Sequence, residues 1–430
     1  MHQATRAGNV EIAKAILPID ICSHRRCARW YGDGAELCYT LCMNNPLRGL
    51  VDGMATRRSF LAGGAAFGTV LAGGARCRAA SSNDTYSISI LGDTHFDAAP
   101  TSLYHGKWKP RHQNDWRDRQ SEFARNQAMW AERLPRLIAA AARTRRPDTA
   151  YLFQMGDLIQ GDCSDFETHL RFFKDAQAAC SKGFGDLPFL TVCGNHDIRG
   201  GGDKAFDAYI LPIAAKAIGK PVTSANFLFF HGPDAFIFVD FMRPDAAQID
   251  AMLDASAGAR HTFFVLHSPI GPYDGWGAYW FLFGKPTDTE KRRALFARLL
   301  KRRAIVLCGH IHRTQIRRWV RPEGEIVEFS ANSVWRPQED TPKVLFDAPA
   351  RFGEYVKAHP ARMDEDHDGC LQKRTVPELL ALVEEYRPGL VEYRQTQSAG
   401  HYMLRVSDAR VEIDFYACDS LVPTTTYHLV

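Results

Sequence analysis

Five short motifs in this sequence carry the side-chain types that hold divalent metal ions in proteins, and each motif directly follows a run of apolar residues. The side chains are carboxylates, imidazoles and an amide, a mixed set of ligands that suits iron, manganese or zinc. In sequence letters the motifs are GDTH at 92–95, GD at 156–157, GNHD at 194–197, a single histidine at 267 and GHIH at 309–312. Because each apolar run reads as a buried strand, the motifs can converge at one edge of a sheet.

The chemistry that such a set can perform is the hydrolysis of phosphate esters. This reaction needs a hydroxide at neutral pH and neutralisation of the charge that builds up on the phosphoryl oxygens, and two metal ions roughly 3.5–4 Å apart supply both. One carboxylate is expected to bridge the ions, and Asp157 is the predicted bridge because it stands alone after its strand. Glycines at 92, 156, 194 and 309 permit sharp turns and a close approach of the backbone to the ions.

Each motif has a second interpretation when it is taken alone. A single Asp-x-His is also typical of a capped turn, and His267 after Phe263–Leu266 is also typical of a buried core histidine. Independent turns would not all place ligand side chains directly after buried strands. The five motifs together therefore predict one dinuclear metal site.

At these five motifs the sequence resembles the calcineurin-like metallophosphoesterase family, over residues 84–345. The resemblance implies an α/β (α+β) fold of two packed mixed β-sheets flanked by helices, a four-layer sandwich. It also implies the metal ligands, which are Asp93, His95, Asp157 and His312 for the first ion and Asp157, Asn195, His267 and His310 for the second.

The resemblance also assigns the catalytic chemistry. In the family the histidine of the third motif faces the substrate, so His196 is expected to stabilise the transition state or to protonate the leaving oxygen, with Asp197 orienting it. A histidine whose pKa lies near neutrality suits such proton transfer. A hydroxide that bridges two iron, manganese or zinc ions is expected to attack the phosphorus of the phosphate-ester substrate in line.

Two positions narrow the substrate class. Purple acid phosphatases carry a tyrosine three residues after the bridging aspartate, where this chain has Gln160, so that branch is disfavoured. Asp197 replaces the glutamate that is usual in protein Ser/Thr phosphatases, which favours the phosphodiesterase and the nucleotide or lipid-headgroup branches of the family. Phosphodiesters are the first choice of substrate, with phosphomonoesters or nucleotides as the alternative. A hypothesis of another class is a scaffold that binds phosphorylated ligands without cleaving them. The complete set of ligand positions argues against that scaffold.

Residues 54–80 have the composition of a twin-arginine export signal. The basic segment Thr56–Leu61 precedes a weakly apolar stretch at 62–72, which is shorter than the roughly twenty residues of a membrane span. We therefore expect the twin-arginine export machinery as a partner and no permanent membrane anchor. The expected location is the bacterial periplasm or the exterior.

Residues 1–53 are the doubtful part of the chain. A signal is expected at the start of a protein, so the simplest interpretation makes Met54 the true start and the upstream segment a misreading. The alternative is a small zinc site, whose spacing fits a zinc pattern only loosely, formed by Cys22, Cys27, Cys38 and Cys42.

Composition limits the remaining functions. With 430 residues, of which 45% are hydrophobic and 24% charged, the chain can form one large core with additions. A net charge of +4 is too small to indicate a nucleic-acid-binding surface, and the basic clusters are better explained as helix ends. Cys163 and Cys180 are candidates for a disulfide, whereas Cys193 and Cys308 are expected to be small core residues at strand ends.

The pattern of apolar residues predicts a mixture of strands and helices. The expected strands are 86–91, 151–155, 189–193, 226–230, 235–240, 262–266, 304–308, 317–320 and 326–329. The expected helices are 121–143 with a kink or restart at Pro135, 206–218, 246–256 and 289–302. This mixture predicts sheets in the core and helices outside.

An aromatic segment at 270–285 directly follows His267 and should lie over the metal site. Trp276 and Tyr279 would then form an apolar platform for the substrate, although ordinary packing beneath a loop explains them equally well. Arg199, just past the third motif, is expected to bind a phosphate in the same cleft.

The region 346–397 is expected to be a helical insertion, after which residues 398–430 complete the core with strands at 401–406 and 411–416. An acidic stretch from Asp364 begins like a calcium loop, but Thr375 stands where such loops have a bidentate glutamate. A solvated turn before a helix at 376–386 is therefore the preferred interpretation.

Overall fold

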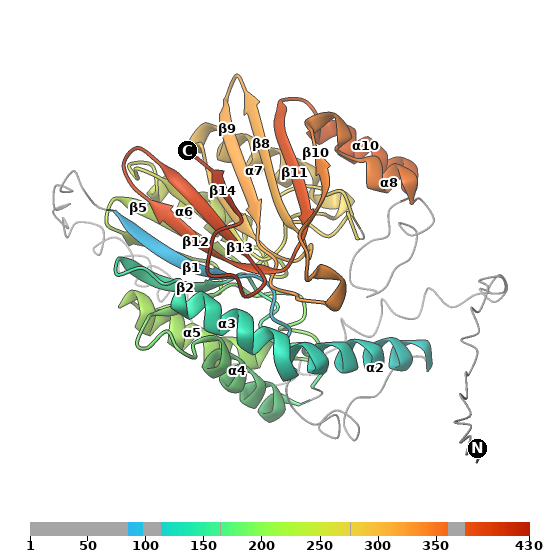
Figure 1. Cartoon of the computed structure of the whole chain (residues 1–430). Coiled ribbons are helices and arrows are strands. Elements are labelled where there is room, and N and C mark those ends of the chain that lie inside the picture. The colour runs from blue at the N-terminus through green and yellow to red at the C-terminus, as the bar shows by residue number, and fades with distance from the viewer. Residues whose placement is uncertain (1–84, 98–112, 164, 276, 360–374) are drawn as a thin grey trace, which may run out of the picture. The chain divides into compact units, whose positions relative to one another are not determined.

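A six-stranded sheet carries the first three ligand motifs. The computed structural model describes residues 85–97, 113–163, 165–275, 277–359 and 375–430 (Figure 1). The strand order of this sheet is β14-β13-β12-β1-β2-β3. Its strands are β1 (Tyr86–Leu91), β2 (Thr149–Gln154), β3 (Phe189–Thr191), β12 (Gly400–Val406), β13 (Val411–Ala417) and β14 (Thr425–His428).

An eight-stranded sheet carries the other two motifs. Its strand order is β10-β11-β8-β9-β7-β6-β5-β4. Its strands are β4 (Phe227–His231), β5 (Asp234–Val239), β6 (Thr262–Leu266), β7 (Ile305–Cys308), β8 (Thr314–Arg321), β9 (Gly324–Ser330), β10 (Lys343–Asp347) and β11 (Leu390–Gln397). Both sheets are mixed, because β1 is parallel to β2 and antiparallel to β12, and β7 is parallel to β9, which is antiparallel to β8.

Helices cover the outer faces of the sheets. On the first sheet these are α3 (Leu134–Arg143), α4 (Phe166–Cys180) and α5 (Asp203–Ile218), which Figure 1 shows together on one side. A π-helical turn, η1 (Met129–Arg133), joins α2 (Gln113–Ala128) to α3. Against the second sheet lie α6 (Ala246–Ala255), α7 (Thr289–Arg302) and α10 (Val376–Tyr386), with the short α8 (Glu354–Ala358) and the turns η2 (Pro286–Asp288), η3 (Pro337–Glu339) and η4 (Pro349–Arg351) between elements.

Three buried apolar clusters hold these layers together. The cluster between the two sheets contains Ile88 and Ile90 of β1, which point the same way because they are two residues apart, together with Phe263 of β6. The second cluster packs helices such as α4, through Phe172, on the first sheet, and the third packs helices such as α7, through Leu299, on the second sheet. The order helix, sheet, sheet, helix confirms the predicted four-layer sandwich.

The strand directions bring the five motifs to one edge. Strands β1, β2 and β3 are mutually parallel, and so are β5, β6 and β7. The motifs follow the carboxyl ends of β1, β2, β3, β6 and β7. Residues that are far apart in sequence therefore meet where these strands end.

Most predicted elements are confirmed within a few residues. The strand at 262–266 and the helix at 289–302 agree residue for residue with β6 and α7. In the helix expected at 121–143, the irregularity at Pro135 is the π-helical turn η1, after which Pro135 occupies the first turn of α3, where its missing N–H is not needed. Helix α4 was not predicted, although Asp165 caps it by accepting from the Thr168 N–H at 2.8 Å.

The region expected to be a helical insertion is partly a strand. Strand β11 pairs antiparallel with both β10 and β8 and so enlarges the second sheet, while α8 and α10 supply the expected helices. Thr375 caps α10 in a capping box with Glu378. The acidic stretch from Asp364 lies outside the described residues. The expected strands at 401–406 and 411–416 are confirmed as β12 and β13, next to β1.

The cysteines that the structure describes are all free thiols. Cys163 and Cys180 are buried free thiols, so the candidate disulfide between them is not formed. Cys193 and Cys308 are buried at strand ends, as predicted. Burial raises the pKa of the Cys180 thiol to about 12, which makes it unreactive at neutral pH.

Residues 1–84 contain the predicted export signal and the four upstream cysteines, and they lie outside the described part of the chain. Within the described part, no helix combines the length and the apolar composition needed to cross a bilayer.

A buried ion pair fixes the segment that follows His267. Arg317 of β8 donates from Nε to Glu328 Oε1 of β9 at 2.8 Å, and both side chains are inaccessible to solvent. Glu328 Oε2 accepts from the Ile270 N–H at 2.8 Å, and Arg317 Nη2 donates to the Gly271 carbonyl at 3.3 Å. The pair thereby holds the chain just after a predicted metal ligand.

Removing one partner of this pair should therefore cost more stability than removing both charges. Arg317→Met leaves the Glu328 carboxylate buried without its cation, and we expect it to lower the free energy of unfolding by about 3–5 kcal/mol. The double variant Arg317→Met/Glu328→Gln has no buried charge and keeps an acceptor for the Ile270 N–H, so most of the loss should be recovered. Urea unfolding followed by circular dichroism measures both values.

The matched control is the exposed pair of Arg293 and Glu385, whose Nε and Oε1 atoms are 2.9 Å apart. Arg293→Met should change the free energy of unfolding by less than about 1 kcal/mol, because exposed pairs contribute little. Equal losses in the single and double variants at Arg317 would contradict the prediction.

Candidate metal centre

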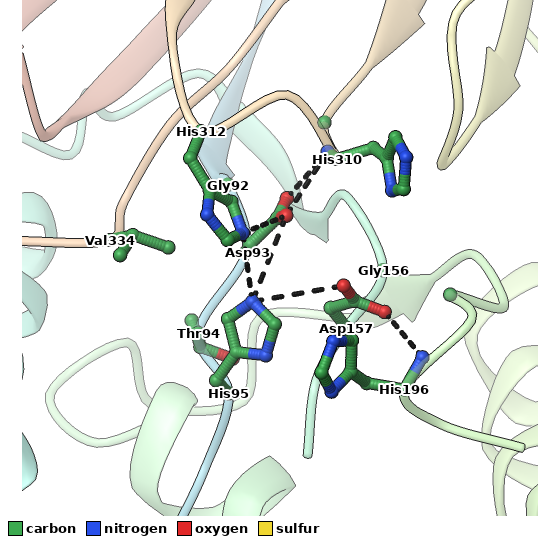
Figure 2. A network of polar contacts seen from close by, with 12 residues as sticks. Gly92, Asp93, Thr94, His95, Gly156, Asp157, His196, His310, His312 and Val334 are labelled. Atoms are coloured by element: carbon green, nitrogen blue, oxygen red, sulfur yellow. Dashed lines mark hydrogen bonds and ion pairs between the residues drawn. The ribbon is translucent and has the colours of Figure 1, made fainter. Parts of the chain in front are cut away.

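Two groups of ligand side chains meet at the carboxyl edge of the strands. The first group is Asp93, His95, Asp157 and His312, and the second is Asp157, His267 and His310. Within each group the ligand atoms lie within 4.8 Å of one another. Figure 2 shows Asp93, His95, His312 and Asp157 pointing toward one another from three separate loops. The structure thus brings together six of the seven predicted ligands in two adjacent groups.

Asp157 belongs to both groups. Its Oδ2 atom lies 3.7 Å from His95 Nε2 in the first group and 3.2 Å from His267 Nε2 in the second. Its Oδ1 atom accepts from the His196 N–H at 2.8 Å, which fixes the orientation of the carboxylate. A carboxylate oxygen between two sets of imidazoles has the position that a bridging ligand needs.

Ring nitrogens face one another across both groups. His95 Nε2 lies 2.9 Å from His312 Nε2, and His310 Nδ1 lies 3.2 Å from His267 Nε2. In addition, His312 Nε2 lies 3.1 Å from Asp93 Oδ2. Imidazole nitrogens and carboxylate oxygens that converge in this way fit transition-metal ions.

Asn195, the seventh predicted ligand, lies in the turn after β3. Its Oδ1 atom is buried and has no hydrogen-bond partner among the residues that the structure describes. A buried acceptor without a donor is costly unless a ligand from outside completes it. The side chain therefore fits a cation as its partner, next to His196, whose N–H contacts Asp157.

The backbone at the ligand positions is strained. His95, Asp157, His310 and His312 have φ values of 42°, 49°, 70° and 48°, in the left-handed region that non-glycine residues seldom occupy. Such conformations persist only where the surrounding structure enforces them, and they cluster at functional sites. The strain marks this edge of the sheets as a site and not as a set of ordinary turns.

Two glycines confirm the predicted close approach of the backbone. A Cβ atom at Gly194 would collide with the backbone and side chain of Asp157, and one at Gly309 would collide with Asp93 Oδ1. Larger residues at these positions would push the carboxylates away from the imidazoles.

Second contacts hold the ligands in place. His267 Nδ1 donates to the Met155 carbonyl at 2.6 Å, which turns Nε2 of the same ring toward Asp157. The His310 N–H donates to Asp93 Oδ1 and Oδ2, at 3.0 and 3.1 Å. These bonds tie the carboxylate of the first motif to the backbone of the fifth.

The electrostatics of the metal-free site favour a bound cation. Burial raises the pKa of Asp157, but His267 and His196 outweigh it and hold this pKa well below its usual range. Burial lowers the pKa of His267, whereas Asp157 and Asp93 raise it, with a net increase to about 9. Burial, helped by the charge of Asp157, raises the pKa of Asp93 to about 6, and burial, helped by His312, lowers that of His95 to about 4. A proton therefore occupies the place of a metal ion at His267 near neutral pH.

His196 lies at the rim of the first group. Its ring makes an edge contact with the ring of His95, with centroids 4.5 Å apart. His196 Nδ1 donates to the Gln160 carbonyl at 2.9 Å, so Nε2 is the ring nitrogen left for the substrate. The side chain of Gln160 points to α2, where it bonds Asn126 and Glu122.

Asp197 accepts from two backbone N–H groups. Its Oδ1 accepts from the Ile159 N–H at 3.1 Å and its Oδ2 from the Gly194 N–H at 2.8 Å. The carboxylate therefore ties the second motif to the third. Burial raises the pKa of Asp197 to about 7.

The predicted substrate residues have different surroundings. Arg199 Nη1 lies 3.1 Å from His196 Nδ1, next to the site as expected. Tyr279 is 5% exposed and belongs to the apolar core behind the second sheet, and Trp276 lies outside the described residues. Trp280 and Tyr273 instead place their rings 5.9 and 6.2 Å from that of His310. Tyr279 is thus packed among apolar residues, and its role as a substrate contact stays a prediction.

Two arginines beside His312 were missed by the sequence analysis. Arg336 Nη2 lies 3.2 Å from His312 Nδ1, and Arg313 Nη1 donates to the His312 carbonyl at 2.7 Å. Arg313 directly follows the fifth motif, which was a usable signal. Arg336 has no such signal, because it follows strand β9 and reaches the site only through the fold.

Comparison with models of protein families shows which family the chain belongs to. A profile of the calcineurin-like phosphoesterase family (Metallophos) matches residues 86–314, which is more than half of the chain. The chain belongs to the calcineurin-like phosphoesterase family. The phosphoesterase is thus a phosphoester hydrolase of a family that uses a dinuclear metal centre, and its own ligand groups fit such a centre.

Solved structures of low sequence identity are similar to the phosphoesterase. GAP50, the anchor in the inner membrane complex of Plasmodium, is 12% identical with a TM-score of 0.39, over 80% of this chain and 88% of that one. A dimetal phosphatase from Danio rerio is 12% identical with a TM-score of 0.43, over 80% and 99%. The purple acid phosphatase PPD1 of yellow lupin is 12% identical with a TM-score of 0.43, over 80% and 53%. A search of curated proteins gave no match.

Because Asp157 is shared, its substitution should affect both metal ions. We expect Asp157→Asn to reduce the metal content of the purified phosphoesterase from two ions to less than one, whereas His310→Ala should lose only the second ion. Inductively coupled plasma mass spectrometry of the dialysed protein measures the content.

The control is His401→Gln, since His401 is a buried histidine that contacts the Ser420 carbonyl and belongs to neither ligand group. This variant should keep both ions. Two tightly held ions in Asp157→Asn would rule out the bridging role.

Metal uptake should release protons. Below pH 9 the His267 imidazole carries a proton that an incoming ion has to displace, so a rise in pH removes the competitor. We expect the apparent affinity of the second ion to rise about tenfold per pH unit up to pH 9 and then to level off. Calorimetry at pH 7.5 in Tris and in HEPES, whose ionisation enthalpies differ, counts the protons. Identical heats in both buffers would contradict the expectation.

Proposed function

We propose that the phosphoesterase hydrolyses phosphodiesters at the two ligand groups joined by Asp157. The observation that carries this proposal is the position of Asp157 Oδ2 between His95 Nε2 and His267 Nε2. The first ion would be held by Asp93, His95, Asp157 and His312, and the second by Asp157, Asn195, His267 and His310. The absence of a thiolate in the set supports iron, manganese or zinc equally.

The ions and the protein side chains would have different roles in the reaction. Bound there, two ions would supply a nucleophilic hydroxide at neutral pH and neutralise charge on the phosphoryl oxygens. His196 donates from Nδ1 to the Gln160 carbonyl, a contact that stabilises its protonated form and leaves Nε2 to give a proton to the leaving oxygen. Asp197 is a positioning residue, because it holds the two loops that carry Asp157 and His196.

Diesters are the preferred substrate class. Support comes from Asp197, which stands where protein Ser/Thr phosphatases have a glutamate. Phosphomonoesters or nucleotides are the runner-up. A scaffold that only binds phosphorylated ligands is disfavoured, because the convergent imidazoles and the unpartnered Asn195 Oδ1 have no use in such a role.

We also infer that the phosphoesterase is exported through the twin-arginine machinery, with residues 54–80 as its signal. Support comes from the sequence, in which Arg57 and Arg58 precede a short apolar stretch. Metal ions could then be loaded before export, because this route carries folded proteins. A periplasmic or secreted location follows from the same inference.

Loss of the His196 imidazole should slow the reaction without emptying the metal site. We expect His196→Ala to lower kcat for bis(4-nitrophenyl) phosphate by about 10²–10⁴, as for other removed general acids. The metal content should stay unchanged, since His196 belongs to neither ligand group. Turnover is measured on stripped protein reloaded with manganese, iron or zinc.

The matched control is His261→Ala, because His261 lies before the amino end of β6, where it contacts the Ser407 carbonyl. This variant should leave turnover unchanged. Faster hydrolysis of 4-nitrophenyl phosphate than of the diester would favour the monoesterase. If neither ester is hydrolysed by the reloaded protein while a phosphorylated ligand still binds, the scaffold replaces the enzyme.

A further inference from the structure

Two arginine side chains border the first ligand group on the outer edge of His312. Arg336 Nη2 lies 3.2 Å from His312 Nδ1, whereas Nε2 of the same ring faces Asp93. Arg313 lies on the neighbouring side, where its Nη1 donates to the His312 carbonyl. The Arg336 guanidinium is therefore one imidazole width from the atoms that would hold the first ion.

These arginines come from two loops that the sheet brings together. Arg313 directly precedes β8, and Arg336 follows the loop that leaves β9. Strands β8 and β9 are antiparallel neighbours, with Gln315 opposite Ser330, so the start of one lies beside the end of the other. The two side chains are thus placed by the sheet and not by a flexible surface.

Arg313 and Arg336 have one buried carboxylate, that of Glu339, close to both of them. Glu339 is fully buried and lies 3.7 Å from Arg313 Nη1, and its Oε2 accepts from the Arg336 backbone N–H. The groups whose charges act on Arg336 are Glu339, Arg125, Arg313 and Glu122. Arg336 therefore has two other guanidinium groups, those of Arg125 and Arg313, in its surroundings.

Arg336 also has a donor that the described residues do not use. Its Nε atom is buried and has no hydrogen-bond partner among them. A buried donor of a charged group is costly when it stays unpaired, so the arrangement favours an acceptor that arrives from outside.

We propose that Arg313 and Arg336 bind a second anionic group of the substrate, a phosphate a few bonds away from the phosphoryl group that is cleaved. This proposal rests on the proposed function, because it concerns the substrate of the same site. Guanidinium groups match phosphate oxygens with paired N–H donors, which a lysine cannot do. Arg199 is the less suitable candidate, since Glu122 and Asp162 lie 3.6 and 3.7 Å from its Nη1.

The test compares two substrates that differ by one phosphate. Thymidine 5′-(4-nitrophenyl phosphate) and its 3′-phosphorylated form release 4-nitrophenol from the same bond. We expect the reloaded phosphoesterase to favour the 3′-phosphorylated form in kcat/KM by about tenfold or more, as for other charge-assisted contacts. Arg336→Gln and Arg313→Gln should each reduce this ratio toward one, and Arg336→Lys should retain part of it.

A control and a charge reversal sharpen the result. Arg405→Gln removes one arginine that is paired with Asp414 on β13, away from the site, and should leave the ratio unchanged. Arg336→Glu should shift preference toward 4-nitrophenyl phosphocholine, which carries a cation in place of the second phosphate. A wild-type ratio near one, or equal losses on both thymidine substrates in Arg336→Gln, would overturn the proposal, since the arginine would then act on the cleaved phosphoryl group.

A binding measurement separates this proposal from the proposed function. Thymidine 3′,5′-bisphosphate should bind to the metal-stripped protein about tenfold more weakly in Arg336→Gln than in the wild type, as measured by calorimetry. Absence of turnover with this binding difference intact would refute the hydrolase and leave the anion site standing. Turnover of both thymidine substrates without any binding difference would refute the anion site alone.

Discussion

The carboxylate of Asp157 is the element on which the rest of the site depends. Burial opposes its charge, yet surrounding imidazoles keep it ionised, so the site stores a negative charge inside the protein. The positive charge of His267 balances that charge, the Met155 carbonyl holds the His267 ring, and Asp93 lies beside the His312 ring. A metal pair replaces the proton on His267 with a stronger counter-charge. Metal binding is therefore coupled to folding, because the folded protein positions the buried negative charge and the metal ions would balance it.

The backbone geometry at the ligand edge of the sheets also lowers stability. Four ligands adopt left-handed backbone conformations. Gly194 and Gly309, the first residues of two motifs, leave no space for a side chain. Both features weaken local stability, and the two-sheet core compensates for them. Strands β1, β2, β6 and β7 are anchored by aromatic and β-branched residues between the sheets, so their ends cannot relax away from the ligands. A rigid core thus maintains a strained rim.

Local signals explain why much of the site was readable from the sequence. Ligands such as Asp93 and His310 sit within a residue or two of a strand end, so a buried strand pattern followed by a glycine was enough to place them. Partnerships that depend on the fold were not readable. Arg336 reaches His312 only because β8 and β9 pair, and Asp197 meets Ile159 through a contact between two loops. The sequence around Tyr279 also does not distinguish an aromatic side chain that faces a substrate from one that packs in a core, because burial depends on how the layers assemble.

The pairing of β11 with β10 means that the length of the segment between these two strands can vary. The two strands are antiparallel neighbours, so the chain leaves the second sheet and re-enters it one strand spacing away. The entropy of closing such a loop grows only slowly with its length, which allows many or few residues to be accommodated there without moving the catalytic edge. Lengthening or shortening the chain at this border of the sheet should therefore leave the metal ligands where they are.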